Sequence, residues 1–147
     1  MVEIRAYEEN DEAAVAALWR EVFGDAPAHN VPEEDIRRKL AVQRDLFFVA
    51  VDGGDVVGTA LAGYDGHRGW VYYVAVKPSH RRRGIGRDFM GRVEKELAAM
   101  GCPKLNLQVR APNRETVAFY EKLGYVVEER VSMGKRLRTA PLDSKEL

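Results

Sequence analysis

The sequence predicts a mixed α/β domain built around an antiparallel sheet. Three apolar runs separated by short glycine-containing turns predict a meander, and helical periodicity on either side of them predicts helices that cover it. The 147 residues are 46% hydrophobic and 31% charged, the balance of a compact globular domain. We therefore expect one domain over residues 1–138. Residues 139–147 have no apolar pattern and are expected to be a frayed tail.

One strand and two helices are expected before the meander. Residues 2–6 are the strand, and Asn10 or Asp11 is expected to cap the first helix. The apolar residues at helical spacing in that helix are Ala14, Val15, Leu18, Trp19 and Val22. Pro32, followed by three acids, predicts a second helix to about Arg44.

The meander should comprise strands at 46–51, 56–64 and 70–76. The third run is apolar in both alternating sets. One set is Trp70, Tyr72, Val74 and Val76, and the other is Val71, Tyr73 and Ala75. Strict alternation would place these sets on opposite faces, so we expect a central strand covered on both faces.

The chain after Pro78 is expected to contain a long helix, a strand, a short helix and a closing hairpin. The long helix carries its apolar stripe on Ile85, Phe89, Val93 and Leu97 and is expected to end at Gly101. The strand is expected at 105–111 and the short helix between Asn113 and Gly124. The hairpin is predicted over 125–137.

Composition excludes several classes of function. Lys plus Arg and Asp plus Glu both number 23, and this net charge of zero argues against binding nucleic acid by bulk electrostatics. Cys102 is the only cysteine, so no disulfide framework is expected and a reducing cytosol is the predicted compartment. No apolar run approaches the length of a membrane span, and the N-terminus lacks an apolar targeting core.

A local basic cluster stands out against this neutral total. Lys77, Arg81, Arg82, Arg83 and Arg87 fall where a strand turns into a helix, with no acid among them. Two glycines in this stretch leave main-chain N–H groups unobstructed at a helix N-terminus, which suits a phosphate or pyrophosphate. The alternative is a solvated basic loop. The stretch lacks the Lys-Ser/Thr ending of a nucleotide P-loop and the third glycine of a dinucleotide fingerprint, so neither ATP nor NAD is indicated.

The pattern that fits is Arg-x-x-Gly-x-Gly, formed by Arg81, Gly84 and Gly86. It resembles the acetyl-CoA signature of the GNAT superfamily of N-acetyltransferases. Residues 107–125 look like that superfamily's second segment, in which an Asn caps a short helix and a Tyr precedes a Leu-Gly-Tyr ending. Residues 63–69 and 132–137 are similar to small bacterial acetyltransferases of the YpeA type. The resemblance implies a central, mixed, mostly antiparallel sheet flanked by helices on both faces.

The resemblance also implies where acetyl-CoA binds. The main chain of Val74 and Val76 would bind the pantetheine arm, residues 82–87 would surround the pyrophosphate, and Asn113 would contact CoA. The full implied set is Val74, Ala75, Val76, Arg81, Arg82, Arg83, Gly84, Ile85, Gly86, Arg87 and Asn113. Val74 and Val76 can be buried in a strand and still bind the pantetheine arm, because that binding would use only their main chain. Helix capping is an equal or simultaneous role for Asn113.

Tyr120 matches the tyrosine that in many members protonates the departing thiolate. A phenol pKa of ~10 lies above a thiol pKa of ~8.5, so the proton moves downhill. A packed helix aromatic is the competing interpretation. The general base is not supplied by the position that the resemblance implies, because Gln108 stands where ribosomal-protein N-terminal acetyltransferases have Glu. Asp65, His67 and Tyr73 are other polar candidates, although Asp65 and His67 fall in a sequence typical of a hairpin turn.

Neither a metal nor a catalytic thiol is expected. His29, His67 and His80 are too scattered to suggest a metal site. Cys102 has no neighbouring His and is expected to be a small buried or idle side chain.

The sequence thus predicts an enzyme that moves an acetyl group directly from acetyl-CoA, as co-substrate, to a primary amine. A CoA-binding module without turnover and a small nucleic-acid-binding protein are the alternatives. The expected partners are acetyl-CoA or CoA and an amine acceptor, a small molecule or peptide, without nucleic acid or membrane. The acceptor stays open, as does monomer or homodimer.

Overall fold

A five-stranded sheet forms the centre of the structure. The computed structural model describes residues 1–24 and 31–137. The strands, in spatial order, are β1 (Val2–Ala6), β2 (Phe47–Asp52), β3 (Asp55–Tyr64), β4 (Gly69–Val76) and β5 (Leu105–Asn106). All neighbours are antiparallel except β4 and β5, which are parallel. The predicted mixed, mostly antiparallel sheet and its meander are confirmed.

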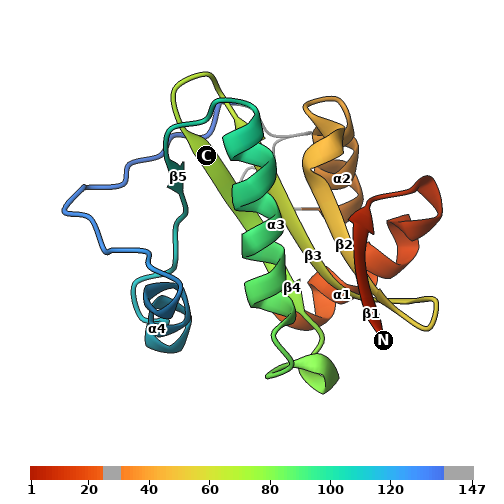
Figure 1. Cartoon of the computed structure of the whole chain (residues 1–147). Helices are drawn as coiled ribbons and strands as arrows, with labels where there is room; N and C mark the ends of the chain where they lie inside the picture. Colours follow the sequence, from red (N-terminus) through yellow and green to blue (C-terminus); the bar gives the residue numbers. More distant parts are fainter. Residues whose placement is uncertain (25–30, 138–147) are drawn as a thin grey trace, which may run out of the picture.

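Helices cover both faces of the sheet (Figure 1). They are α1 (Glu12–Phe23) and α2 (Pro32–Leu40) on one face, α3 (Ile85–Ala99) on the other, and α4 (Arg114–Lys122) beyond the β5 edge. Alternation along β2 creates the two cores, because Phe47 packs with Trp19 of α1 while Phe48 packs with Phe89 of α3. Among the described residues, no helix combines the length and apolarity needed to cross a membrane.

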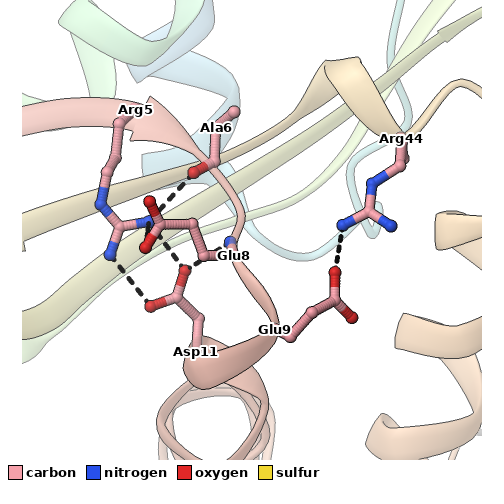
Figure 2. Close-up of polar contacts among 6 residues, drawn as sticks. All are labelled: Arg5, Ala6, Glu8, Glu9, Asp11 and Arg44. Carbon is pink, nitrogen blue, oxygen red and sulfur yellow. Dashed lines mark hydrogen bonds and ion pairs between the residues drawn. The ribbon is translucent and has the colours of Figure 1, made fainter.

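An ion pair joins β1 to the start of α1 (Figure 2). Arg5 donates from both terminal nitrogens to the Asp11 carboxylate, at 2.8 and 3.0 Å, and the main-chain N–H of Glu8 donates to Asp11 Oδ2 at 2.8 Å. Asp11 precedes α1, as predicted, but its side chain makes no capping bond to that helix. Burial acts to raise the Asp11 pKa, and the bonds from Arg5 and Glu8 outweigh it, so the pKa lies below its ordinary value.

The second helix is shorter than predicted. It ends at Leu40, and Gln43, which has a positive φ of 53°, turns the chain into a 3₁₀ turn at Arg44–Leu46. The Gln43 side chain explains the early end. Its amide donates to the carbonyl of Tyr64 at 2.9 Å and accepts from the Tyr64 N–H at 2.8 Å. These two hydrogen bonds hold the chain after α2 at the end of β3. They join residues far apart in the sequence, so helical periodicity could not predict them.

Strict alternation along β4 is interrupted by a bulge. Thr59 of β3 pairs with Ala75, whereas Leu61 pairs with Tyr72, so β4 holds an extra residue between these pairs. Tyr73, with a φ of 49°, lies in this interval. As a result Val71 packs on the α3 side with Val74, and the prediction that it shares a face with Tyr73 is wrong. Trp70 and Tyr72 are 38% and 43% exposed, so coverage of both faces is incomplete.

The C-terminal strands differ most from the prediction. Only Leu105–Asn106 of the predicted strand at 105–111 pairs with β4, and no strand occurs within 125–137. The predicted closing hairpin is therefore absent from the described residues. With β5 this short, the sheet offers little strand edge beside this segment, and five of its apolar residues stay exposed. They are Val126, Val127, Val131, Met133 and Leu137. The predicted tail at 139–147 lies outside the described residues.

Candidate active site

The β4 edge next to β5 is open along most of its length. The β4–β5 ladder contains only the pairs Gly69–Leu105 and Trp70–Asn106. Beyond them, within the described residues, β4 has no strand on this side as far as Val76. Val74, Ala75 and Val76, the residues predicted to bind pantetheine, lie in this open stretch. An open strand edge presents main-chain donors and acceptors to an extended ligand that carries amides.

The open stretch of β4 leads directly into the basic loop. A 3₁₀ turn at Pro78–His80 follows the strand, and α3 begins at Ile85 after Gly84, which has a φ of 82°. Arg82 also has a positive φ, 64°. Two left-handed residues just before a helix turn the chain sharply and leave the first main-chain N–H groups of α3 directed out of the helix. Arg81, Arg82, Arg83 and Arg87 are all exposed around this point.

The arginines of the loop are not equivalent. Arg81 Nε donates to the carbonyl oxygen of Val76 at 3.2 Å, which braces the loop against the end of β4. That bond uses one of the main-chain acceptors predicted to serve the pantetheine arm. Arg87 approaches Asp88 only at 4.0 Å. Arg82 and Arg83 have no acidic partner among the described residues, so their charge is available to an anion.

Gly86 is explained by packing between helices. A Cβ at this position would lie 3.0 Å from the Phe119 ring of α4, closer than ordinary contact. Ile85 is buried in the α3 core, so any contact it makes with a ligand would use its main chain. The glycine therefore lets α4 approach the first turn of α3. This contact brings the loop and the residues predicted on α4 into one region.

Asn113 and Tyr120 lie at opposite ends of α4. The Asn113 side chain accepts from the Thr116 N–H at 3.2 Å, which is the predicted capping role. Tyr120 is 8% exposed and joins the α3 core, with its ring edge-on to Phe119 at 4.9 Å and to Tyr125 at 5.8 Å. Burial raises the Tyr120 pKa to about 12. No hydrogen bond to its hydroxyl is found within the described residues.

The structure separates the candidates for the general base. The Asp65 carboxylate accepts from the N–H groups of His67 at 2.7 Å and Arg68 at 2.8 Å, which is the predicted hairpin turn. Gln108 is exposed and donates to Ser132 at 2.7 Å. Tyr73 donates to Asp35 at 2.6 Å, and burial together with this bond raises the Tyr73 pKa well above its ordinary value. A phenol with so high a pKa is a poor base at neutral pH.

A cavity of about 420 Å³ lies between α2 and the bulge of β4. Its lining is Asp35, Arg38, Lys39, Val42, Tyr72 and Tyr73. Apart from Tyr73, these residues were not among the sequence candidates. One feature of the sequence could have indicated this cavity. The apolar stripe of α2 has only two residues, Ile36 and Leu40, although the helix packs against the sheet. Polar residues that face inward from such a helix are candidates for a site.

Lys39 is the most unusual group in this lining. It is 5% exposed, and its amine donates to the carbonyl oxygens of Val42 at 3.0 Å and Ala62 at 2.5 Å. Burial lowers the Lys39 pKa to about 8. At neutral pH the amine is therefore mostly protonated, and it adds positive charge at the cavity wall.

The histidines and the cysteine lie in separate places. His80 contacts Asp52 at 2.8 Å, whereas His67 lies in the β3–β4 turn and His29 is outside the described residues. Cys102 is half-buried, and its thiol donates to the Lys104 carbonyl at 3.4 Å. Within residues 1–24 and 31–137, no group of three or more His, Cys, Asp or Glu side chains is arranged to hold a metal.

Comparison with known proteins establishes the family. Residues 12–125 match the model of the acetyltransferase (GNAT) family, so the chain belongs to the GNAT family. An acetyltransferase of Pectobacterium atrosepticum is 46% identical over 136 residues, 92% of this chain and 96% of that protein. These matches confirm the predicted family and the predicted acetyltransferase class.

Solved structures of low identity share the fold. Ard1 from Thermoplasma volcanium superposes with a TM-score of 0.78 at 23% identity, covering 86% of this chain and 84% of that one. The aminoglycoside N-acetyltransferase AAC(6')-Iy, solved in complex with CoA, gives a TM-score of 0.77 at 20% identity, with coverage of 94% and 96%. At these identities the likeness supports the fold alone.

Proposed function

We propose that this protein transfers the acetyl group of acetyl-CoA directly to a primary amine. The observation that carries the proposal is the continuity between the open edge of β4 and the arginine-rich N-terminus of α3. The pantetheine arm, a chain with amides, would pair with the main chain of Val74–Val76 as an added strand does. The pyrophosphate would meet Arg82, Arg83, Arg87 and the first N–H groups of α3.

The chemistry needs no covalent enzyme intermediate. The neutral amine attacks the thioester carbonyl carbon, so a C–N bond forms, the C–S bond breaks and the amine loses a proton. A main-chain N–H near the β4 bulge would stabilise the oxyanion. Tyr120 would give its proton to the departing thiolate. Its pKa of about 12 lies above a thiol pKa of ~8.5, so the transfer runs downhill.

The cavity between α2 and β4 is the proposed acceptor site. Tyr72 and Tyr73 line it, and they directly precede the main chain proposed to hold pantetheine. An amine bound there would lie beside the thioester end of the arm. This assignment is favoured over a CoA-binding module without turnover, which has no need of a cavity at this position. A nucleic-acid-binding role has only the basic loop to support it, in a chain of zero net charge. We further propose a cytoplasmic location, from the single cysteine.

Calorimetry and a thiol-release assay test the proposal together. Acetyl-CoA should bind clearly more tightly than ATP, and some primary amines should release free CoA. Replacing both Arg82 and Arg83 by Ala should weaken acetyl-CoA binding by about 10-fold or more, the scale of one to two charge-assisted hydrogen bonds. Arg130→Ala, which removes an exposed arginine from the C-terminal segment, is the control and should change nothing. Equal affinity for ATP and acetyl-CoA would contradict the proposed site.

A further inference from the structure

The cavity beside β4 contains charges of both signs. Its lining includes one carboxylate, Asp35, and two cations, Arg38 and Lys39, and the remaining members are Val42, Tyr72 and Tyr73. With Lys39 protonated, the lining carries net positive charge. A polyamine or an aminoglycoside would bring several further cations into this space without acids to pair them. Such acceptors are therefore disfavoured by charge.

The carboxylate of Asp35 is already engaged on both oxygens. Oδ1 pairs with Arg38 one helical turn away, and Oδ2 accepts from the Tyr73 hydroxyl at 2.6 Å. The Asp35 side chain is 18% exposed, while that of Arg38 is 61% exposed. Arg38 uses one terminal nitrogen in this pair, and its other donors have no partner within the described residues. The cavity thus presents a fixed carboxylate beside a guanidinium with donors to spare.

We propose that the acceptor is a free apolar amino acid, whose carboxylate binds Arg38 and whose α-amine lies beside Asp35 and Tyr73. The inference rests on the proposed function and names its substrate class. A zwitterion presents an amine and a carboxylate close together, with the charges reversed relative to the Asp35–Arg38 pair. Val42 and the two tyrosine rings supply the apolar surface for a side chain. The volume, about 420 Å³, suits a small molecule.

The described part of the site offers no free base, because both oxygens of Asp35 already accept from Arg38 and Tyr73, and this favours an acceptor amine that loses its proton readily. Gln108 takes no proton, and the raised pKa of Tyr73 keeps its phenol protonated. The pKa of a peptide α-amine is ~8. The carboxylate of a free amino acid raises that pKa, but it stays below the ~10.4 of a lysine ε-amine, so removing the proton costs less. The proton released from an α-amine can pass to solvent.

A matched panel of acceptors tests this substrate class. Free CoA would be measured at saturating acetyl-CoA with L-leucine, L-methionine and L-phenylalanine, each beside its primary amide and its decarboxylated amine, and with spermidine and kanamycin. At least one free amino acid should exceed its amide and its amine in kcat/KM by about 10-fold or more, the scale of a charge-assisted contact. The amide also represents a peptide N-terminus.

Two arginines of α2 provide the variant and its control. Arg38→Gln should lower kcat/KM for the preferred amino acid by about 10-fold or more and bring it close to that of the decarboxylated amine. Arg37→Gln removes the neighbouring exposed arginine, which pairs with Glu12 at 3.9 Å outside the cavity, and should leave both values unchanged. Acetyl-CoA affinity should be the same in both variants.

The possible failures point to different conclusions. If amides, simple amines or polycations are turned over as well as or better than the free amino acids, the proposed acceptor class is wrong. Equal losses in Arg37→Gln and Arg38→Gln would also overturn it. If acetyl-CoA does not bind, or binds while no amine of the panel is acetylated, the proposed function is what fails.

Discussion

The Thr59 hydroxyl donates to the carbonyl oxygen of Tyr73 at 2.8 Å and fixes the bulge of β4 from the neighbouring strand. Thr59 is fully buried, and its oxygen accepts in turn from the Trp19 indole N–H at 2.9 Å. The Trp19 ring stacks on the Tyr73 ring with centroids 3.9 Å apart. The side chain and the main chain of Tyr73 are therefore both held by α1 and β3, at the point where the proposed acceptor site meets the proposed cofactor site.

Thr59→Val should destabilise the protein and slow turnover. The change keeps the shape of the side chain but leaves the buried indole N–H of Trp19 and the Tyr73 carbonyl without this partner. We expect a loss of about 1–3 kcal/mol in the free energy of unfolding. Thr59→Ser, which keeps the hydroxyl, should retain most of the bulge geometry. Urea unfolding with steady-state kinetics would check both. Equal kcat in the Val variant and the wild type would show that the bulge is held without Thr59.

Two glycines of α3 should respond oppositely to alanine. Gly86→Ala would place a Cβ 3.0 Å from the Phe119 ring and should displace α4, which lowers stability and weakens acetyl-CoA binding. At Gly91 a Cβ meets nothing within 4 Å, so Gly91→Ala should stabilise the helix by about 0.5–1 kcal/mol. Thermal unfolding and calorimetry would compare them. A stabilised Gly86→Ala with normal binding would refute the packing explanation for this glycine.

The ion pair in Figure 2 should make stability depend on pH in the acid range. The Asp11 pKa is lowered on folding, so its contribution is present above the unfolded value of ~3.9 and is lost as pH falls through the folded value. Asp11→Asn should cost about 1–3 kcal/mol at pH 7 and progressively less at low pH. Glu9→Gln is the control, since its exposed pair with Arg44 should contribute under ~1 kcal/mol. Unfolding curves from pH 7 to 3 would measure the difference.

Lys39 should also make stability rise with pH, but in the alkaline range. Its folded pKa of about 8 lies below the unfolded value of ~10.4, so the unfolded chain holds the extra proton between these values and stability should rise with pH. Lys39→Met should remove that rise, which we expect to reach about 1 kcal/mol by pH 9.5 once solvent screening is allowed for. The test is the difference between wild-type and variant unfolding at pH 7, 8 and 9.5. Parallel profiles would mean that Lys39 titrates normally.

Features set by local sequence were predicted well. The apolar stripe of Ile85, Phe89, Val93 and Leu97 fixed the long helix because helical spacing depends on neighbours within one or two turns. The meander followed from apolar runs between glycine turns. The basic loop could be located because its charge is concentrated in a few consecutive residues. Which of those residues contact a cofactor stays a prediction.

Features that depend on distant partners were missed. The early end of α2 depends on Gln43 bonding to Tyr64, and the bulge depends on Thr59 and Trp19, so neither leaves a periodic signal. The hairpin at 125–137 is predicted from two consecutive runs, yet an isolated two-stranded hairpin is marginal without a third strand, and β5 has only two residues. Asp35 and Lys39 were not predicted as site residues, because charged residues on a short helix are expected to face solvent.

Tyr120→Phe distinguishes a chemical role for this residue from a structural one. The change keeps the ring that packs against Phe119 and Tyr125 and removes only the hydroxyl. No hydrogen bond to that hydroxyl is found within the described residues, so the free energy of unfolding should fall by no more than about 1 kcal/mol. Acetyl-CoA affinity should barely change. Calorimetry and urea unfolding would establish both points.

The turnover of Tyr120→Phe decides whether the Tyr120 hydroxyl acts as the general acid. General acid catalysis is typically worth 10² to 10⁴-fold, so we expect kcat to fall by about two orders of magnitude, and by less if water can protonate the thiolate. The assay needs a true acceptor amine, because background thioester hydrolysis need not use the same proton path. Phe119→Leu, which changes the neighbouring ring without removing an acid, controls for disturbed packing of α4. If Tyr120→Phe keeps full turnover under conditions where chemistry limits the rate, the buried ring is a packing residue and another group protonates the thiolate.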